Sequence, residues 1–285
     1  MKFNSTGLIE KGIMLCIVHF FIFAHSSTAV AAQIEPQRIV TLSPHLAELV
    51  FSLGAGHQLV GVVEHSNYPQ QVNYIPRIGS ASGLDIEQIL SIKPDLVLAW
   101  QRGSRDADIK KLKELGLRVV SIKSESLEDI PESLKILGEL LNRQQRSSTM
   151  IELFNKQLKT ISDKYRDQAV YRVFIEISSQ PLMGLTNRDP FAAGLQLCGL
   201  KNIFSNMDKG AIITDLESIL SRDVAYVLLR QKTTSNDYDA RKKFYQINDY
   251  STIGFVSFDE NTAFRQTPRL LEAVDEVCGA VYGLN

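Results

Sequence analysis

Short runs of β-branched and apolar residues alternate with helical stretches from residue 38 onward, and this alternation most constrains the fold. Buried strands are predicted at residues 38–42, 59–63, 95–99 and 117–122. Helices are predicted between and after them at residues 47–53, 86–91, 108–115 and 127–141. Strands separated by helices pair in parallel, because each crossing helix returns the chain to the same edge of the sheet. The first part of the chain is therefore predicted to form a parallel α/β lobe.

One long charged stretch, residues 143–168, interrupts the alternation and has neither Gly nor Pro. Its apolar residues recur at helical spacing, at Met150, Leu153, Phe154, Leu158 and Ile161. The alternation then resumes, with strands predicted at residues 171–177, 225–229 and 255–258 and helices at 191–198, 216–221 and 269–281. We therefore predict an α/β protein of two parallel-sheet lobes, residues 33–142 and 169–285, joined by one long rigid helix at residues 143–168.

Residues 1–32 have the succession of charged, apolar and small residues that is typical of a cleavable secretory signal. Lys2 and Lys11 precede an apolar run at residues 13–24, and small residues follow at 26–32. The run is shorter than a membrane-spanning helix requires. Cleavage is expected after Ala31 or Ala32, and the mature protein is predicted to be soluble in the periplasm.

Cleavage would also remove Cys16 and leave Cys198 and Cys278. Because the periplasm is an oxidising compartment, we predict a disulfide between these two residues, with two buried free thiols as the alternative. Both residues fall in the second predicted lobe, so the disulfide would cross-link that lobe internally.

Composition and motifs argue against several classes of function. The formal net charge is −1 and 44% of residues are hydrophobic, so neither nucleic acid nor an anionic membrane surface is an expected partner. Residues 79–83 resemble a nucleophile elbow but have Ala81 where that motif needs Ser. We predict no catalytic residues, no cofactor and no enzymatic activity. A serine hydrolase that uses Ser43 and His45 remains a remote alternative.

Histidines are confined to the first lobe once the signal is removed. They are His45, His57 and His65. A receptor for a bare transition-metal ion would draw ligands from both lobes, so no metal site is predicted.

An internal repeat relates the two lobes. Residues 85–91 (DIEQILS) and residues 215–221 (DLESILS) each precede a predicted strand. In both copies the Asp is a candidate helix N-cap and a Glu, Glu87 or Glu217, lies in the first turn. Chance similarity of two amphipathic segments is the alternative.

The carboxyl ends of the predicted strands locate a ligand site, because loops and helix N-termini converge there in parallel α/β folds. These ends are residues 43–45, 65–68, 100–102, 178–183, 230–231 and 261–265. They would line one cleft whose aromatic, thioether and hydrogen-bonding groups suit a large, flat, partly apolar ligand. The predicted ligand-binding residues are Ser43, Pro44, His65, Tyr68, Trp100, Met183 and Arg265.

Several stretches, taken in order, resemble a known family. They are residues 38–44 (RIVTLSP) with Glu48, residues 83–100 (GLDIEQILSIKPDLVLAW), residues 172–174, Cys198-Gly199, residues 202–204, Pro268-Arg269 and Cys278. Together they are similar to the vitamin B12-binding members of the helical-backbone, class III family of periplasmic binding proteins, which also carries ferric siderophores and haem. The resemblance covers nearly all of the mature chain.

This resemblance implies a solute-binding protein that delivers a corrinoid, vitamin B12 foremost, to the transmembrane permease of an ABC importer. It implies two lobes joined by a single long helix, with only small closure motions. It also implies that Glu87 and Glu217 dock on the permease, one from each lobe. We expect a monomer.

The sequence departs from the vitamin B12-binding pattern at several cleft positions. Ala81 and Ala211 stand where the pattern has tryptophans, His65 where it has Tyr and Met183 where it has Phe, whereas Trp100 is retained. A ferric siderophore or haem receptor therefore remains the alternative. Haem would need an axial ligand, for which His65, His45 and Tyr68 are candidates. An anionic siderophore would need cleft cations, for which the candidates are Arg102, Arg230 and Arg265.

Overall fold

The computed structural model describes residues 35–284 except 81, 102, 232–234 and 248–252. The predicted signal at residues 1–32 lies outside the described residues, as do Ala81 and Arg102. Within the described part of the chain, no helix is both long enough and apolar enough to cross a bilayer.

The first sheet has the four parallel strands that the alternation predicts. Its order is β2 (Leu59–Val62), β1 (Ile39–Thr41), β5 (Leu96–Trp100) and β6 (Val119–Ile122). Successive residues of a strand point to opposite faces, so Leu96 and Leu98 join one core while Val97 joins another. Helices α1 (Pro44–Ser52) and α4 (Asp129–Leu140) cover the first face, and α2 (Ile86–Ser91) and α3 (Asp106–Glu114) cover the second.

Helix α1 begins earlier than the predicted residue 47. Pro44 occupies the first turn, where its missing N–H costs nothing, and Ser43 precedes it in an extended conformation with φ −152°. Pro44 and His45 are therefore part of the helix and not of a loop.

Residues 79–80 and 83–84 do not form the strand-to-helix turn of a nucleophile elbow. They form a two-stranded antiparallel hairpin, β3 (Gly79–Ser80) and β4 (Gly83–Leu84). Gly79 has φ +122°, and a Cβ there would lie 2.4 Å from the carbonyl oxygen of Gly83. The backbone of this turn therefore requires glycine at position 79.

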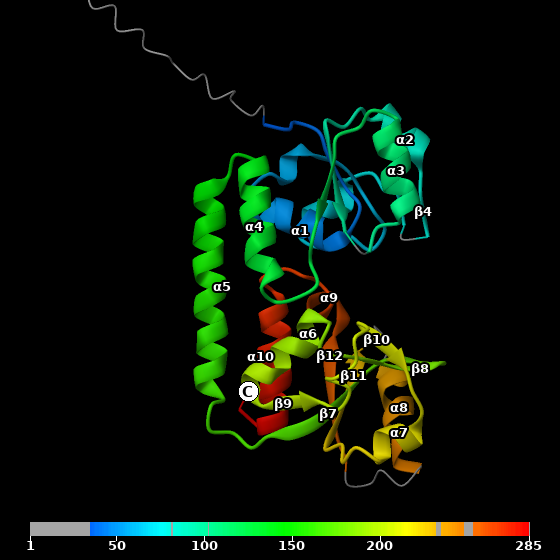
Figure 1. Ribbon diagram of the computed structural model, residues 1–285, viewed down its shortest axis with the longest axis vertical. Coiled ribbons are helices and arrows are strands. Elements are labelled where there is room, and N and C mark those ends of the chain that lie inside the picture. Colours follow the sequence, from blue (N-terminus) through cyan, green and yellow to red (C-terminus); the bar gives the residue numbers. More distant parts are fainter. Residues whose placement is uncertain (1–34, 81, 102, 232–234, 248–252, 285) are drawn as a thin grey trace, which may run out of the picture. The chain divides into compact units, whose positions relative to one another are not determined.

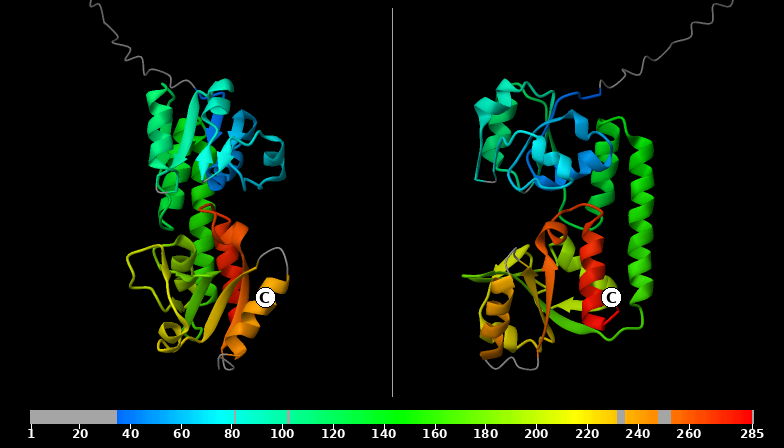
Figure 2. Two further views of the ribbon diagram at one scale, coloured as in Figure 1. Left: turned by 90° about the vertical axis from the view of Figure 1, so that its right-hand side faces the viewer. Right: turned by 180° about the vertical axis from the view of Figure 1, so that it is seen from behind.

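The predicted linking helix is confirmed as α5 (Gln144–Lys164), whose 21 residues span about 31 Å. Its buried residues, Ser147, Phe154 and Ile161, are seven residues apart and lie on one face. Helix α5 runs beside α4, as Figure 1 and the right-hand view of Figure 2 show. The two helices approach closely because Gly138 of α4 has no side chain, and a Cβ there would lie 2.5 Å from that of Ser147. Phe154 and Ile161 share one core with residues of both lobes.

The second sheet is separate from the first, with no strand pairing between them among the described residues. Strands β11 (Tyr226–Gln231) and β12 (Gly254–Asp259) run parallel to β7 (Tyr171–Ser179), as predicted, and β9 (Leu200–Asn202) is a further parallel strand. Strands β8 (Leu182–Leu185) and β10 (Ala211–Ile213) extend it in the antiparallel direction, so this sheet is mixed. Sequence patterns did not indicate β8, β9 and β10.

Helices cover both faces of the second sheet. Helices α6 (Pro190–Gly194) and α10 (Leu270–Tyr282) pack with the 3₁₀ helix η3 (Leu195–Cys198) on one face, and α7 (Leu216–Leu220) and α8 (Ser235–Ile247) pack on the other. A short helix, α9 (Glu260–Ala263), follows β12. The predicted helix at residues 191–198 is thus divided between α6 and η3, and α8 and α9 were not predicted.

The predicted disulfide is present. Cys198 at the end of η3 bonds to Cys278 on α10, with a Cα–Cα distance of 6.1 Å and a sequence separation of 80. Both residues are fully buried in the second lobe. The alternative of two free thiols is therefore wrong.

Candidate ligand-binding site

A cavity of about 530 Å³ is lined by residues of both lobes. The first lobe contributes Trp100 at the carboxyl end of β5 and four residues that follow β6. The second lobe contributes the segments that surround β8 and β10 and the residue Gln266. The lining consists of Trp100, Lys123, Ser124, Glu125, Ser126, Leu185, Asn187, Arg188, Asp189, Pro190, Asp208, Gly210, Ala211 and Gln266. The volume of the cavity lies in the range usual for small-molecule sites.

Of the seven predicted ligand-binding residues, Trp100 lines this cavity. It is half-buried, and its ring meets that of His45 edge-on at a centroid distance of 5.1 Å. Ala211, where the family pattern has a tryptophan, also lines the cavity. The other six predicted residues are not in the lining, and their contact with a ligand stays a prediction: Ser43, Pro44, His65, Tyr68, Met183 and Arg265.

Four polar atoms of the lining are buried and have no hydrogen-bond partner among the described residues. They are Trp100 Nε1, Ser124 Oγ, Asn187 Oδ1 and Gln266 Oε1. A buried polar group without a partner costs about 1–3 kcal/mol of stability, so proteins generally satisfy such groups. All four residues line the same cavity, so hydrogen-bonding capacity that no described residue uses is concentrated around it.

Sequence patterns did not identify Ser124, Asn187 and Gln266. Ser124 follows β6, a strand that was predicted but whose carboxyl end was not considered, so this signal was available. Gln266 lies one residue beyond the predicted loop 261–265. Asn187 follows β8, which the sequence pattern does not reveal.

Charged groups of both signs surround the cavity, and several are paired. Lys123 Nζ lies 3.1 Å from Asp129 Oδ1, and Arg188 Nη2 lies 3.2 Å from Asp208 Oδ1. Asp189 caps α6 by accepting from the backbone N–H groups of Phe191 and Ala192. Burial raises the pKa of Asp189 to about 6, against the effect of these two hydrogen bonds. The lining therefore offers no concentration of unpaired positive charge among its described residues.

The described lining also has no His, Tyr, Met or Cys side chain. These four side chains are the usual protein ligands of haem iron. The cavity as described thus lacks a group that could take an axial position on a haem.

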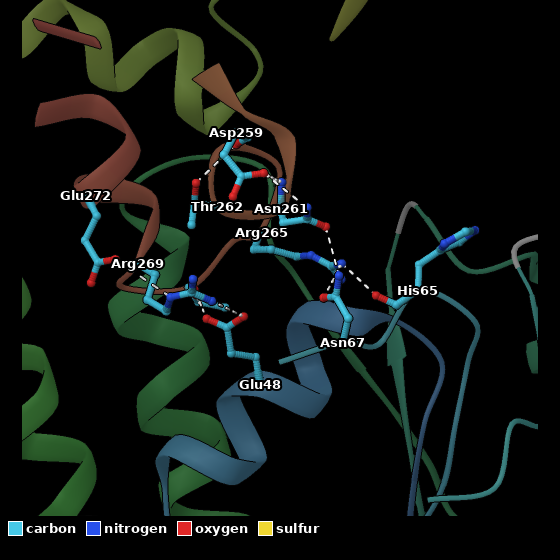
Figure 3. Close-up of polar contacts among 10 residues, drawn as sticks. Glu48, His65, Asn67, Asp259, Asn261, Thr262, Arg265, Arg269 and Glu272 are labelled. Atoms are coloured by element: carbon cyan, nitrogen blue, oxygen red, sulfur yellow. Dashed lines mark hydrogen bonds and ion pairs between the residues drawn. The ribbon is translucent and has the colours of Figure 1, made fainter. Parts of the chain in front are cut away.

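The predicted residues His65 and Arg265 lie in a polar cluster that connects the two lobes (Figure 3), and the ring of Tyr68 lies against Arg269 of this cluster. Arg265 Nη2 donates to the backbone oxygen of His65 at 2.7 Å and to Asn67 Oδ1 at 3.2 Å. Asn67 Nδ2 in turn donates to Asn261 Oδ1 at 3.0 Å. The His65 side chain is exposed. Arg265 therefore already has partners from the first lobe in this structure.

Glu48 forms the buried part of the same cluster. From α1 it accepts hydrogen bonds from Thr267 Oγ1 at 2.7 Å and from Arg269 Nη1 at 3.3 Å, both in the second lobe. Burial raises the pKa of Glu48, and the contacts with Thr267 and Arg269 oppose that rise. The guanidinium of Arg269 also lies over the ring of Tyr68, 3.6 Å from its centroid. These contacts fix the segment of residues 265–269 against the first lobe.

Ser43 and His45 lie together but do not form a hydrolase site. Ser43 Oγ and His45 Nε2 are 3.5 Å apart, and both residues are almost fully buried. Burial lowers the pKa of His45 to about 3, with a further contribution from the positive charge of Arg265. Among the described residues, no carboxylate is hydrogen-bonded to the His45 ring. An imidazole with so low a pKa is a poor general base at neutral pH.

The repeated segments form matching helices, α2 and α7. Asp85 accepts from the backbone N–H of Gln88 at 2.9 Å, and Asp215 accepts from that of Ser218 at 2.7 Å. Each helix buries its isoleucine completely, Ile89 or Ile219. Both helices expose the first-turn glutamates, Glu87 and Glu217, and each also exposes a leucine one turn later, Leu90 or Leu220.

Two α/β lobes joined by a long helix, with a cavity lined from both, define a two-lobed solute-binding protein. Residues 39–248 match the model of the periplasmic binding protein family, and the chain belongs to this family.

Individual relatives give a closer comparison. The vitamin B12-binding protein of Pectobacterium atrosepticum is 29% identical over 253 residues, which cover 87% of this chain and 89% of that protein. The crystal structure of the periplasmic vitamin B12-binding protein BtuF of Vibrio cholerae has a TM-score of 0.75 at 25% identity, covering 87% of this chain and 98% of that chain. A possible iron-binding periplasmic solute-binding protein from Staphylococcus epidermidis has a TM-score of 0.73 at 26% identity, covering 87% and 99%.

Proposed function

We propose that this protein captures a corrinoid, vitamin B12 foremost, in the cavity between its lobes and delivers it to the permease of an ABC importer. The names of the relatives from Pectobacterium atrosepticum and Vibrio cholerae support this ligand. The observation that carries the proposal is the cavity lining, which combines Trp100 with buried neutral hydrogen-bonding groups from both lobes. A corrinoid suits it because the ligand has a broad apolar ring edge surrounded by amide side chains.

A ferric siderophore or haem is the second candidate, and the possible iron-binding relative from Staphylococcus epidermidis favours it. The cavity chemistry argues for the corrinoid. A haem iron commonly takes a protein axial ligand, whereas the cobalt of a corrinoid is held by its own ring and axial groups. An anionic siderophore would require unpaired cations, whereas Arg188 is paired with Asp208 and Lys123 with Asp129.

We also propose how the protein is exported and how it delivers its ligand. Residues 1–32 would direct the chain to the periplasm and then be removed. Glu87 and Glu217 would dock on two basic sites of the permease, since their helices are matched in capping, burial and exposure. The protein would act as a monomer without a cofactor and without catalysis.

Calorimetric titration of the mature protein with cyanocobalamin, haem and a ferric siderophore tests the ligand. We expect a saturating isotherm with cyanocobalamin, accompanied by quenching of the fluorescence of Trp100, the single tryptophan of the chain. A Trp100→Phe variant should bind more weakly and should lose the fluorescence change. Saturable binding of haem or the siderophore together with a flat cyanocobalamin titration would favour the second candidate.

A further inference from the structure

The indole of Trp100 lies directly against the backbone of the turn that follows its strand. A Cβ at position 103 would lie 1.7 Å from Cε3 of the indole and 2.2 Å from Cζ3. Carbon atoms in contact are about 3.5–4.0 Å apart, so a side chain on residue 103 would displace the ring. Gly103 is exposed and its φ lies outside the left-handed region, so its backbone conformation does not require glycine. The feature that requires glycine at this position is the indole.

Two hydrogen bonds close this turn. The backbone N–H of Trp100 donates to Ser104 Oγ at 3.0 Å, and the backbone N–H of Ser104 donates to the Trp100 oxygen at 3.0 Å. Trp100 lies beyond Leu98, the last residue of β5 that pairs with β1, which leaves its N–H to the hydroxyl of Ser104. The closed turn holds Gly103 against the indole.

His45 supports the indole from helix α1. The two rings have a centroid distance of 5.1 Å and an interplanar angle of 89°, a favourable geometry for an aromatic pair. His45 is only 2% exposed, so the surrounding core holds its imidazole in place. The indole, in contrast, is half-buried and lines the cavity. Gly103 and His45 thus fix a ring whose remaining surface is left for the cavity.

We infer that Gly103 and His45 are positioning residues, which hold the indole of Trp100 in the orientation that contacts the ligand. The inference rests on the proposed function and deepens it, because neither residue lines the cavity and each acts through Trp100. A ring that is fixed before binding loses little freedom when the ligand arrives. Immobilising a free side chain would weaken binding about two- to tenfold.

Four substitutions separate the position of the indole from other effects. Gly103→Ala adds one methyl group, which displaces the ring. Gly83→Ala is its matched control, because the φ of Gly83 also lies outside the left-handed region and a Cβ there would approach no atom closer than 3.5 Å. His45→Ala removes the supporting ring, and His45→Phe keeps an aromatic ring in its place. Urea denaturation establishes that each variant is folded.

Fluorescence reports on this ring alone, because Trp100 is the single tryptophan of the chain. In the free protein, Gly103→Ala should shift the emission to longer wavelengths, since a displaced indole meets more water. His45→Ala should add a fast anisotropy decay, on the timescale of side-chain rotation. In calorimetric titrations both variants should bind cyanocobalamin about two- to tenfold more weakly than the wild type. Gly83→Ala and His45→Phe should behave like the wild type in both measurements.

The same substitutions in a Trp100→Ala protein distinguish positioning from a structural role. Without the indole, Gly103→Ala and His45→Ala should leave the remaining affinity unchanged, because the group through which they act is absent. Equal weakening with and without the indole would overturn the inference.

Two further outcomes are decisive. If Gly103→Ala shifts the emission but binds cyanocobalamin as the wild type does, the inference is overturned and the corrinoid function stands. If the wild type does not bind cyanocobalamin, the proposed function is overturned, and the inference with it.

Discussion

Single residues around the cavity contribute hydrogen-bonding capacity more than charge. The atoms Trp100 Nε1, Ser124 Oγ and Gln266 Oε1 are unpaired, whereas Lys123 and Arg188 are held by nearby carboxylates. Unpaired neutral groups distinguish ligands by the position of donors and acceptors. Paired charges, in contrast, add little attraction for a ligand of either sign.

Asp189 provides a prediction at the scale of one residue. Its pKa of about 6 in the folded protein exceeds that of an exposed Asp, about 4. Its contribution to stability is therefore fully present below pH 4 and is lost as the pH rises through 6. Asp189→Asn keeps the N-cap and removes the titration. The variant should match the wild type at pH 4 and exceed its free energy of unfolding by up to about 3 kcal/mol at pH 8.

Urea denaturation of both proteins across this pH range measures the difference, and titration of other groups cancels in the comparison. Asp215→Asn is a suitable control, because Asp215 caps α7 in the same way but has a lowered pKa, through its hydrogen bonds with Ser218. A stability difference between Asp189→Asn and the wild type that does not vary with pH would contradict the prediction.

At the scale of elements, the two copies of the repeat adopt one local structure. In each copy an Asp caps a short helix and an Ile is buried against a sheet. A non-glycine residue with positive φ follows each helix, Lys93 at 48° after α2 and Asp223 at 49° after α7. The chain then enters an interior strand, β5 or β11. The resemblance of residues 85–91 to residues 215–221 therefore extends from the sequence to the local structure.

The docking proposal predicts that both repeat helices are needed for uptake. Glu87→Lys with Glu217→Lys should weaken binding to the permease at least about tenfold, because each loses a charge-assisted contact and gains a repulsive one. Cyanocobalamin affinity should be unchanged, since neither residue lines the cavity. Uptake of labelled vitamin B12 by cells that carry the variant measures the effect.

A matched double variant controls for the change in net charge. Glu114→Lys with Glu276→Lys reverses one exposed glutamate on a helix of each lobe, outside α2 and α7. It should retain uptake. Equal uptake by the two double variants would show that the repeat helices have no special role in docking.

At the scale of the whole molecule, the two sheets are separate but their cores are not. One hydrophobic core includes Leu49 of α1, Phe154 of α5 and Val274 of α10. The polar contacts of Glu48 with Thr267 and Arg269 add a second connection between the lobes. Large closure of the lobes would break both connections, so we expect the protein to bind its ligand with small motions.

The disulfide allows a prediction about global stability. Cys198→Ala with Cys278→Ala should lower the free energy of unfolding by up to about 4.5 kcal/mol, the loop entropy for a separation of 80 residues. Affinity for cyanocobalamin should persist under native conditions, because neither cysteine lines the cavity. Chemical denaturation of the oxidised wild type and the variant measures the effect. Equal midpoints with equal slopes would contradict it.

The sequence by itself determined the elements whose signals are local. Apolar periodicity predicted the four strands of the first sheet, the strands β7, β11 and β12 of the second and the long helix α5, because burial imposes a period on the sequence of an element. Cys198 and Cys278 are the two cysteines that remain once the predicted signal is removed, and the predicted export to an oxidising compartment therefore predicted their disulfide. Trp100 was placed at the cavity because it directly follows a predicted strand, and the carboxyl end of a parallel strand is where ligands bind.

Tertiary structure alone decided which strand ends meet. The cavity is lined from the segments after β6 and around β8 and β10, whereas Arg265 and Tyr68 are engaged by contacts between the lobes. An unpaired buried atom such as Gln266 Oε1 has no sequence signature, because its lack of a partner depends on side chains far away in the chain. Local sequence specifies the elements, and long-range packing selects which polar groups are left for a ligand.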